Sequence, residues 1–388
     1  MPVLMILGCI GFMFGTGGSA LIAKTLGEGD KNRANSIFSL IVWTSAGCGV
    51  VLAILGVILV RPVAAALGAE GEMLDRCVLY GRIILSALPF YVLQYEFQCL
   101  FAAAEKPKLG LYVTVAAGVA NMLLDALFVA VLPWGLAGAA VATAVSQVVG
   151  GVIPLIYFAN KKSSLLRLGK FRFDRKVILK TCSNGSSEFM SNVSFSLVSM
   201  LYNYQLMKYA GENGIAAYGV LMYVSMIFMA IFIGYSVGAS PVFGYNYGAQ
   251  NHRELKSLLH KSLIVVAVTA ALMFLAGQLL GSPLSRLFVG YDSELLVITK
   301  RAFTFFSFSF LFSGFSIFGS AFFTALNDGL TSALIAFLRT LVFQVSAVLI
   351  FPLIWHLDGI WLSIVGAEVM ALAATVMFLA AKKKKYGY

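Results

Sequence analysis

The chain has 388 residues, of which 60% are apolar and only 12% are charged, and its mean hydropathy is +0.89. Soluble globular proteins carry roughly 25% charged residues, so this composition excludes a water-soluble domain. In lipid every backbone polar group needs an internal partner, which leaves helices or a closed β-barrel. The apolar runs are about 20 to 33 residues long, whereas barrel strands alternate over roughly 10 residues. We therefore predict an all-α polytopic membrane protein.

Eleven spans are predicted in chain order. They cover residues 1–26, 36–67, 77–104, 109–132, 136–159, 177–209, 214–247, 257–288, 295–325, 330–354 and 359–381. The net charge of +11 comes mainly from Lys and Arg in alternate loops and in the tail Lys382–Lys385. By the positive-inside rule these loops and the C-terminus are cytoplasmic, and the chain starts outside. The placement favours a lipid bilayer over nucleic acid as the partner.

The longest loop divides the spans into two groups. We expect an N-terminal lobe over 1–160, a basic cytoplasmic linker over 161–176 and a C-terminal lobe over 177–388. The basic residues of the linker either bind anionic lipid head groups or simply fix the topology of a solvated loop.

The two groups align without a gap when the sequence is shifted by 221 residues. The matched pairs are Gly17 with Gly238, Ser19 with Ser240, Gly27 with Gly248, Phe97 with Phe318, Phe101 with Phe322, Ala104 with Ala325, Leu109 with Leu330, and Gly138 with Gly359. Both groups run in the same direction, which predicts a parallel repeat with its axis along the membrane normal. The second group begins near Asp174, so the first would begin about 47 residues before Met1. We therefore expect twelve helices in a complete protein, with the first helix and part of the second absent here.

Three segments resemble the multidrug and toxic compound extrusion family. Residues 15–35, GTGGSALIAKTLGEGDKNRAN, resemble the end of that family's second helix and the loop after it. PVFGYNYGAQN at 241–251 resembles the equivalent place in the eighth helix, and DGIWLS at 358–363 resembles the start of the last. The resemblance covers helices two to twelve and implies a location in a bacterial inner membrane. It implies two six-helix lobes around a central cavity and the exchange of a substrate, often an organic cation, for H⁺ or Na⁺.

Ionisable side chains at membrane depth are candidates for function, and Asp125 is the first of them. Asn121 lies one turn earlier on the same helical face, and Thr143 lies at a similar depth on the next span, roughly 10 to 17 Å below the outer surface. Their oxygens suit Na⁺, or an acid that takes up a proton. The family resemblance implies that Asn121, Asp125 and Thr143 couple the ion. The alternative is a buried pair that locks two helices.

Glu188 lies near the middle of its span, and Glu96 is a second acid at membrane depth. Glu188 either couples or binds substrate, or it holds hydrogen bonds inside its lobe, while Glu96 would face the cavity and attract a cation. Arg339 and Glu368 lie on neighbouring spans, and we expect them to pair because an unpaired buried charge is costly.

Aromatic residues are dense at 303–318, FTFFSFSFLFSGFSIF. Tyr202, Tyr223 and Phe306 are candidates for lining a cavity that holds flat cations through cation–π contacts. Packing in the core or against lipid is the alternative for most of these rings.

The predicted function is a monomeric antiporter that exports small cationic drugs or metabolites in exchange for H⁺ or Na⁺. The chain contains no GxxxxGK[ST] motif for ATP and no metal-ligand spacing, so we expect neither an enzyme nor a cofactor. A lipid-linked oligosaccharide flippase is one alternative, but it would carry several cavity arginines, and here Arg339 alone lies at mid-membrane depth. The other alternative is a non-transport scaffold, but a scaffold does not require a buried carboxylate such as that of Asp125.

Overall fold

The computed structural model describes residues 2–66, 68–160 and 165–388, and all regular secondary structure in these ranges is helical. This confirms the predicted all-α class. Met1, residue 67 at the end of a predicted span, and residues 161–164 of the predicted linker lie outside the described residues.

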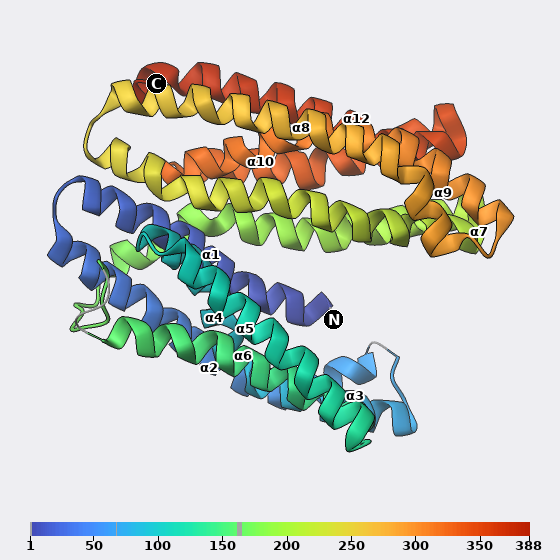
Figure 1. Cartoon of the computed structure of the whole chain (residues 1–388), viewed down its shortest axis with the longest axis horizontal. Helices are drawn as coiled ribbons and strands as arrows, with labels where there is room; N and C mark the ends of the chain where they lie inside the picture. Colours follow the sequence, from blue (N-terminus) through green and yellow to red (C-terminus); the bar gives the residue numbers. More distant parts are fainter. Residues whose placement is uncertain (1, 67, 161–164) are drawn as a thin grey trace. The chain divides into compact units, whose positions relative to one another are not determined.

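The chain forms two compact units, Met1–Gly185 and Ser186–Tyr388, and α7 runs from one into the other. The first unit contains α1 (Pro2–Gly27), α2 (Lys31–Ala66), α3 (Gly71–Ser86), α4 (Leu88–Ala103), α5 (Pro107–Asp125), the π-helix η1 (Ala126–Val131), α6 (Gly135–Ala159) and the start of α7 (Arg175–Gly248). Within this unit α4 is central, since it contacts α1, α2, α5 and α6 (Figure 1). The predicted lobe limits of 160 and 177 stay a prediction.

The second unit contains the rest of α7 and the remaining helices. These are α8 (His252–Val289), α9 (Ser293–Phe306), the short η2 (Ser307–Ser309), α10 (Phe310–Ala325), α11 (Gly329–Phe337), the π-helix η3 (Leu338–Phe343) and α12 (Gln344–Tyr386). Here α10 is central and contacts α8, α11 and α12. The two central helices, α4 and α10, carry the phenylalanines that the repeat matched.

The lengths and apolarity of these helices suit membrane spans. In the described part of the chain, eight helices are long and apolar enough to cross a membrane, and the pair α3 and α4, bent by 51°, makes a ninth span. Two of the nine are broken, at Gly211 (φ 61°) and His356 (φ 50°), which are the positions where the sequence placed loops. Eleven segments result, as predicted, except that the span expected at 77–104 begins at Gly71 and is bent at Ala87.

Large apolar side chains are exposed along the outer faces of these helices. Ile58 is 65% exposed, Leu279 74% and Leu287 78%. Soluble monomers rarely present contiguous apolar surface of this kind, whereas a lipid-facing helix must. The protein is a multi-pass membrane protein.

The internal repeat appears in the backbone at the turns that follow α1 and α7. Gly29 and Gln250, 221 positions apart, both adopt a left-handed φ, 86° and 56°. Each donates its N–H to the carbonyl three residues earlier, at 3.0 and 3.1 Å. The next residues, Asp30 and Asn251, then cap α2 and α8 by accepting the N–H of the residue three positions later, at 2.9 and 3.1 Å. Two different sequences thus build the same turn in the two units.

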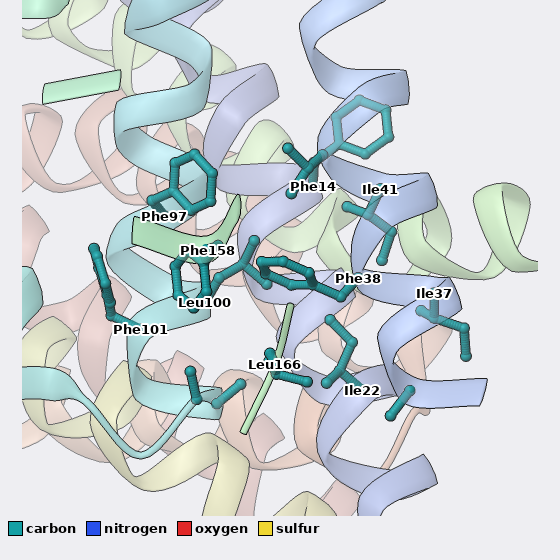
Figure 2. Close-up of a cluster of buried hydrophobic side chains, with 14 of the residues drawn as sticks. Phe14, Ile22, Ile37, Phe38, Ile41, Phe97, Leu100, Phe101, Phe158 and Leu166 are labelled. Atoms are coloured by element: carbon teal, nitrogen blue, oxygen red, sulfur yellow. The ribbon is translucent and has the colours of Figure 1, made fainter. Parts of the chain in front are cut away.

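The core of the first unit is a cluster of aromatic and aliphatic side chains around Phe158 of α6 (Figure 2). The Phe158 ring lies 4.9 Å from Phe38, 5.6 Å from Phe97 and 5.1 Å from Phe101. Leu166, from the loop before α7, is fully buried in the same cluster. One end of the predicted linker is therefore fixed to the helices.

Candidate functional site

The predicted pair Asn121 and Asp125 lies at the C-terminal end of α5. Asp125 is the last α-helical residue, and the π-helix η1 begins directly after it. π-Helical turns are rare, occur mostly inside α-helices, and are frequent at functional sites. A π-helical turn contains more residues than an α-helical one. The residues before and after Asp125 therefore do not continue along the same face of the helix.

Both side chains of the pair are partly buried, and each has an enclosed polar atom. Asn121 Nδ2 and Asp125 Oδ1 are shielded from solvent and have no hydrogen-bond partner among the described residues. Buried polar atoms are almost always partnered, so each exception needs an explanation such as a bound ion, a proton or water. The Asp125 charge also acts on Tyr80 of α3. Among the described residues of its unit, Asp125 therefore forms no ion pair with a basic side chain.

Thr143 lies on α6, which contacts α5 and η1. Figure 1 shows α5 and α6 beside each other. Its hydroxyl donates to the carbonyl of Ala139 on its own helix at 2.9 Å. Among the described residues it forms no hydrogen bond with Asn121 or Asp125. Asn121 and Asp125 thus lie one turn apart on α5 with their enclosed atoms unbonded in the described part of the chain, and Thr143 lies on the neighbouring helix, bonded to its own backbone.

Gln147 is a polar residue at membrane depth that sequence reasoning missed. It lies one turn after Thr143, is 7% exposed, and has no partner for its Oε1 in the described part of the chain. Gly151, one turn further, lies against the backbone of Phe90, so this face of α6 points toward α4. The spacing of four from Thr143 was the signal available in the sequence.

Glu96 of α4 is fully buried in the first unit. It accepts a hydrogen bond from Ser45 of α2, and its Oε1 has no partner among the described residues. Gly15 of α1 lies against the Glu96 backbone, with its missing Cβ position 3.0 Å from the Glu96 Cα. The expectation that Glu96 faces an open cavity is therefore wrong, because α1, α2 and α4 close around it.

Glu188 lies near Arg339 of η3 in the second unit, close enough for the two charges to interact. Arg339 donates from Nε and Nη2 to the Glu368 carboxylate at 2.8 to 3.1 Å. The predicted Arg339–Glu368 pair is confirmed. Glu188 is thus the second acid beside one arginine, a grouping that the sequence did not reveal.

The three candidate cavity aromatics differ in their surroundings. Tyr202 is 1% exposed, bonds Gln344 and Ser363 at 2.8 Å each, and stacks on Tyr218. Phe306 is 2% exposed in the same core, while Tyr223 is 70% exposed. Tyr202 and Phe306 have no free ring face for a ligand and instead pack the second unit, which corrects the prediction for these two. Tyr223 keeps its exposed ring.

A family model described as MatE matches residues 1–127 and 189–350. The chain is also similar to curated proteins named "Multidrug export protein MepA". The one from Staphylococcus saprophyticus is 23% identical over 97% of this chain and 83% of its own length. The one from Staphylococcus haemolyticus is 24% identical over 98% of this chain and 83% of its own length.

Solved structures share the fold. One is described as the outward-facing conformation of a multidrug resistance MATE family transporter of the MOP superfamily, with a TM-score of 0.92 and 23% identity over 99% of this chain and 87% of that one. Another is a MOP superfamily transporter from Pyrococcus furiosus, whose reversed binding-pocket polarity is said to suggest a different function. It has a TM-score of 0.90 and 23% identity over 98% of this chain and 87% of that one. Matches of this length show that the chain shares the fold of these structures.

Proposed function

The chain belongs to the MatE family of multidrug efflux transporters, and on that premise we propose that it is an antiporter driven by H⁺ or Na⁺. Its substrates are small organic cations, including drugs, which it exports across the inner membrane as a monomer with its C-terminus in the cytoplasm. The multidrug export proteins with which it aligns over nearly its whole length support the substrate class.

The observation that carries the coupling proposal is the enclosed, unpartnered Oδ1 of Asp125. Because no described basic side chain pairs with it, this oxygen can take up either a proton or a hard cation such as Na⁺. The Asn121 side chain one turn away offers its amide oxygen as a further ligand. A charged carboxylate at membrane depth is costly, so loading and unloading of the ion changes which arrangement of the helices is stable.

The substrate surface is proposed on the exposed ring of Tyr223. An organic cation over a tyrosine face gains roughly 0.5–1 kcal/mol at an exposed site and more when water is excluded. A role in moving lipid-linked sugars is disfavoured because the mid-membrane Arg339 is already bonded to Glu368, which leaves less of its charge for a phosphate.

Reconstituted protein in liposomes tests the proposal. A fluorescent organic cation should move against its gradient when a pH gradient or a Na⁺ gradient is imposed, and dissipating the effective gradient should stop it. Separate application of the two gradients identifies the coupling ion. Equal movement of the dye with and without either gradient would contradict antiport.

A further inference from the structure

A basic cavity of about 620 Å³ lies at the end of the first unit where α2 and α7 begin. Four cationic side chains line it: Arg33, Arg172, Arg175 and Lys176. Among the described residues, none of the four forms an ion pair. The one acid in the lining, Asp174, accepts the backbone N–H of Lys176 at 2.8 Å. The cavity therefore carries an excess of uncompensated positive charge.

The wall of this cavity is apolar on the side toward the helices. Ile37 and Leu40 of α2 and Val177 of α7 are buried residues that face it, and Phe173 lines it with 71% of its surface exposed. The cavity thus combines exposed cationic side chains with buried aliphatic ones. A phospholipid is complementary to this arrangement, because its anionic head group can contact the cations and its acyl chains can contact the aliphatic side chains.

Specific contacts hold the cavity in shape. The N–H of Arg167 donates to Asn35 Oδ1 of α2 at 2.7 Å, and the N–H of Gly169 donates to Ser39 Oγ at 3.0 Å. Leu166 is inserted beside Phe38 in the buried cluster (Figure 2). The chain from 165 to 169 is thus fastened to α2, which sets Arg172–Lys176 opposite Arg33. A solvated loop that only sets the topology would not need these hydrogen bonds to α2 or the buried Leu166.

We propose that this cavity binds the phosphate-bearing head group of an anionic phospholipid from the cytoplasmic leaflet. Four like charges around one cavity repel one another, and an anionic head group relieves that repulsion. The apolar wall accepts the first part of the acyl chains, so a phospholipid is favoured over a free phosphate. The orientation rests on the proposed cytoplasmic position of these loops. The binding itself does not depend on transport.

The test uses the purified full chain in neutral detergent with dioctanoyl phosphatidylglycerol as the probe. Binding is followed by native mass spectrometry and by the shift in unfolding temperature, and dioctanoyl phosphatidylcholine and inorganic phosphate serve as comparison ligands. The variant Arg33→Gln/Arg175→Gln/Lys176→Gln removes three of the cations. Its matched control, Lys106→Gln/Lys108→Gln/Arg253→Gln, removes three bases that do not line the cavity.

The triple variant should bind phosphatidylglycerol at least about tenfold more weakly, because each base near a membrane surface raises affinity roughly fivefold. The control, and Arg33→Lys/Arg175→Lys, should bind as the wild type does. If the triple variant does not fold, Lys176→Gln alone should still show a severalfold loss. Unchanged binding in the variants that remove charge, Arg33→Gln/Arg175→Gln/Lys176→Gln or Lys176→Gln alone, would overturn the proposal. Stabilisation by inorganic phosphate equal to that by phosphatidylglycerol would also overturn it and show a site for free anions.

Discussion

Arg339 and Glu368 form a buried ion pair between η3 and α12, with three hydrogen bonds of 2.8 to 3.1 Å. Their side chains are 17% and 4% exposed. A bidentate arginine–carboxylate contact in such surroundings fixes both side chains, and it fastens the π-helical turn of η3 to the last helix.

Removal of one partner of this pair should destabilise the protein strongly. In Glu368→Gln the Arg339 charge stays buried without its carboxylate, so we expect a loss of about 3 kcal/mol in the free energy of unfolding. The double variant Arg339→Met/Glu368→Met should lose clearly less, because no buried charge remains. Thermal unfolding in detergent measures both. If the double variant were less stable than Glu368→Gln, the unpaired Arg339 charge would not be the cause of the loss.

Glu188→Gln should affect transport more than stability. Glu188 interacts with Arg339 electrostatically but makes no ion pair within 4.0 Å among the described residues, so its removal leaves the Arg339–Glu368 bonds in place. We expect at least a tenfold loss in dye efflux with an unfolding temperature within a few degrees of the wild type. Normal efflux combined with reduced stability would assign Glu188 a structural role instead.

Gly17→Ala should disturb the packing of α1. A Cβ at Gly17 would collide with the backbone carbonyl of Thr181 at the start of α7, and backbone cannot move aside as a side chain can. We expect a loss of about 1–3 kcal/mol. The matched control is Gly47→Ala in α2, where no atom lies within 4 Å of the new Cβ, and it should be neutral or slightly stabilising. Equal unfolding temperatures for the two variants would contradict the close contact.

Asp328 joins the α10–α11 turn to the C-terminal tail. Its carboxylate accepts from the Tyr386 hydroxyl at 2.7 Å and lies 3.6 Å from Lys382. Burial raises the pKa of Asp328, but the hydrogen bonds from Tyr386 and Thr331 and the Lys382 charge outweigh it, so the pKa lies below its ordinary value.

Because the folded-state pKa of Asp328 is lowered, its stabilising effect is complete above the unfolded pKa of about 3.9 and is lost as the pH falls through the folded value. Asp328→Asn should therefore lower the free energy of unfolding by about 1.5 kcal/mol at pH 7. At the acid end of the range, the variant and the wild type should have nearly the same stability. The unfolding temperature between roughly pH 3 and pH 7 checks this. A difference that stays constant over that range would contradict the ionic role.

The helices and their internal repeat could be predicted from the sequence, because the length of an apolar run and the residues of a turn are local properties. The breaks at Gly211 and His356 fall where short polar loops interrupt apolar runs. The bend at Ala87 was missed although Pro89 follows it, since apolar length alone does not separate one long span from two bent helices. The π-helices after Asp125 and around Arg339 leave no mark in hydropathy.

The site was predictable in part. Membrane-depth acids stand out by composition, so Asp125, Glu96 and Glu188 could be singled out. Which of them is enclosed or partnered depends on contacts between distant helices, such as Ser45 with Glu96, and no local pattern encodes those. The same holds for Tyr202, whose aromatic ring suggested a ligand surface but whose hydroxyl is bonded inside the core.

The central claim is that Asp125 carries the coupling ion, and ion-driven dye transport by Asp125→Asn in liposomes tests it most directly. Asn has nearly the same shape as Asp but takes up neither a proton nor a charge-balancing cation, so the variant should insert and fold normally. Asn121→Ala and Thr143→Val serve as graded comparisons. We expect Asp125→Asn to bind the dye but to lose transport against a gradient by at least about a hundredfold, because the variant lacks the carboxylate that loads the ion. Gradient-driven transport at the wild-type rate in Asp125→Asn would contradict the claim.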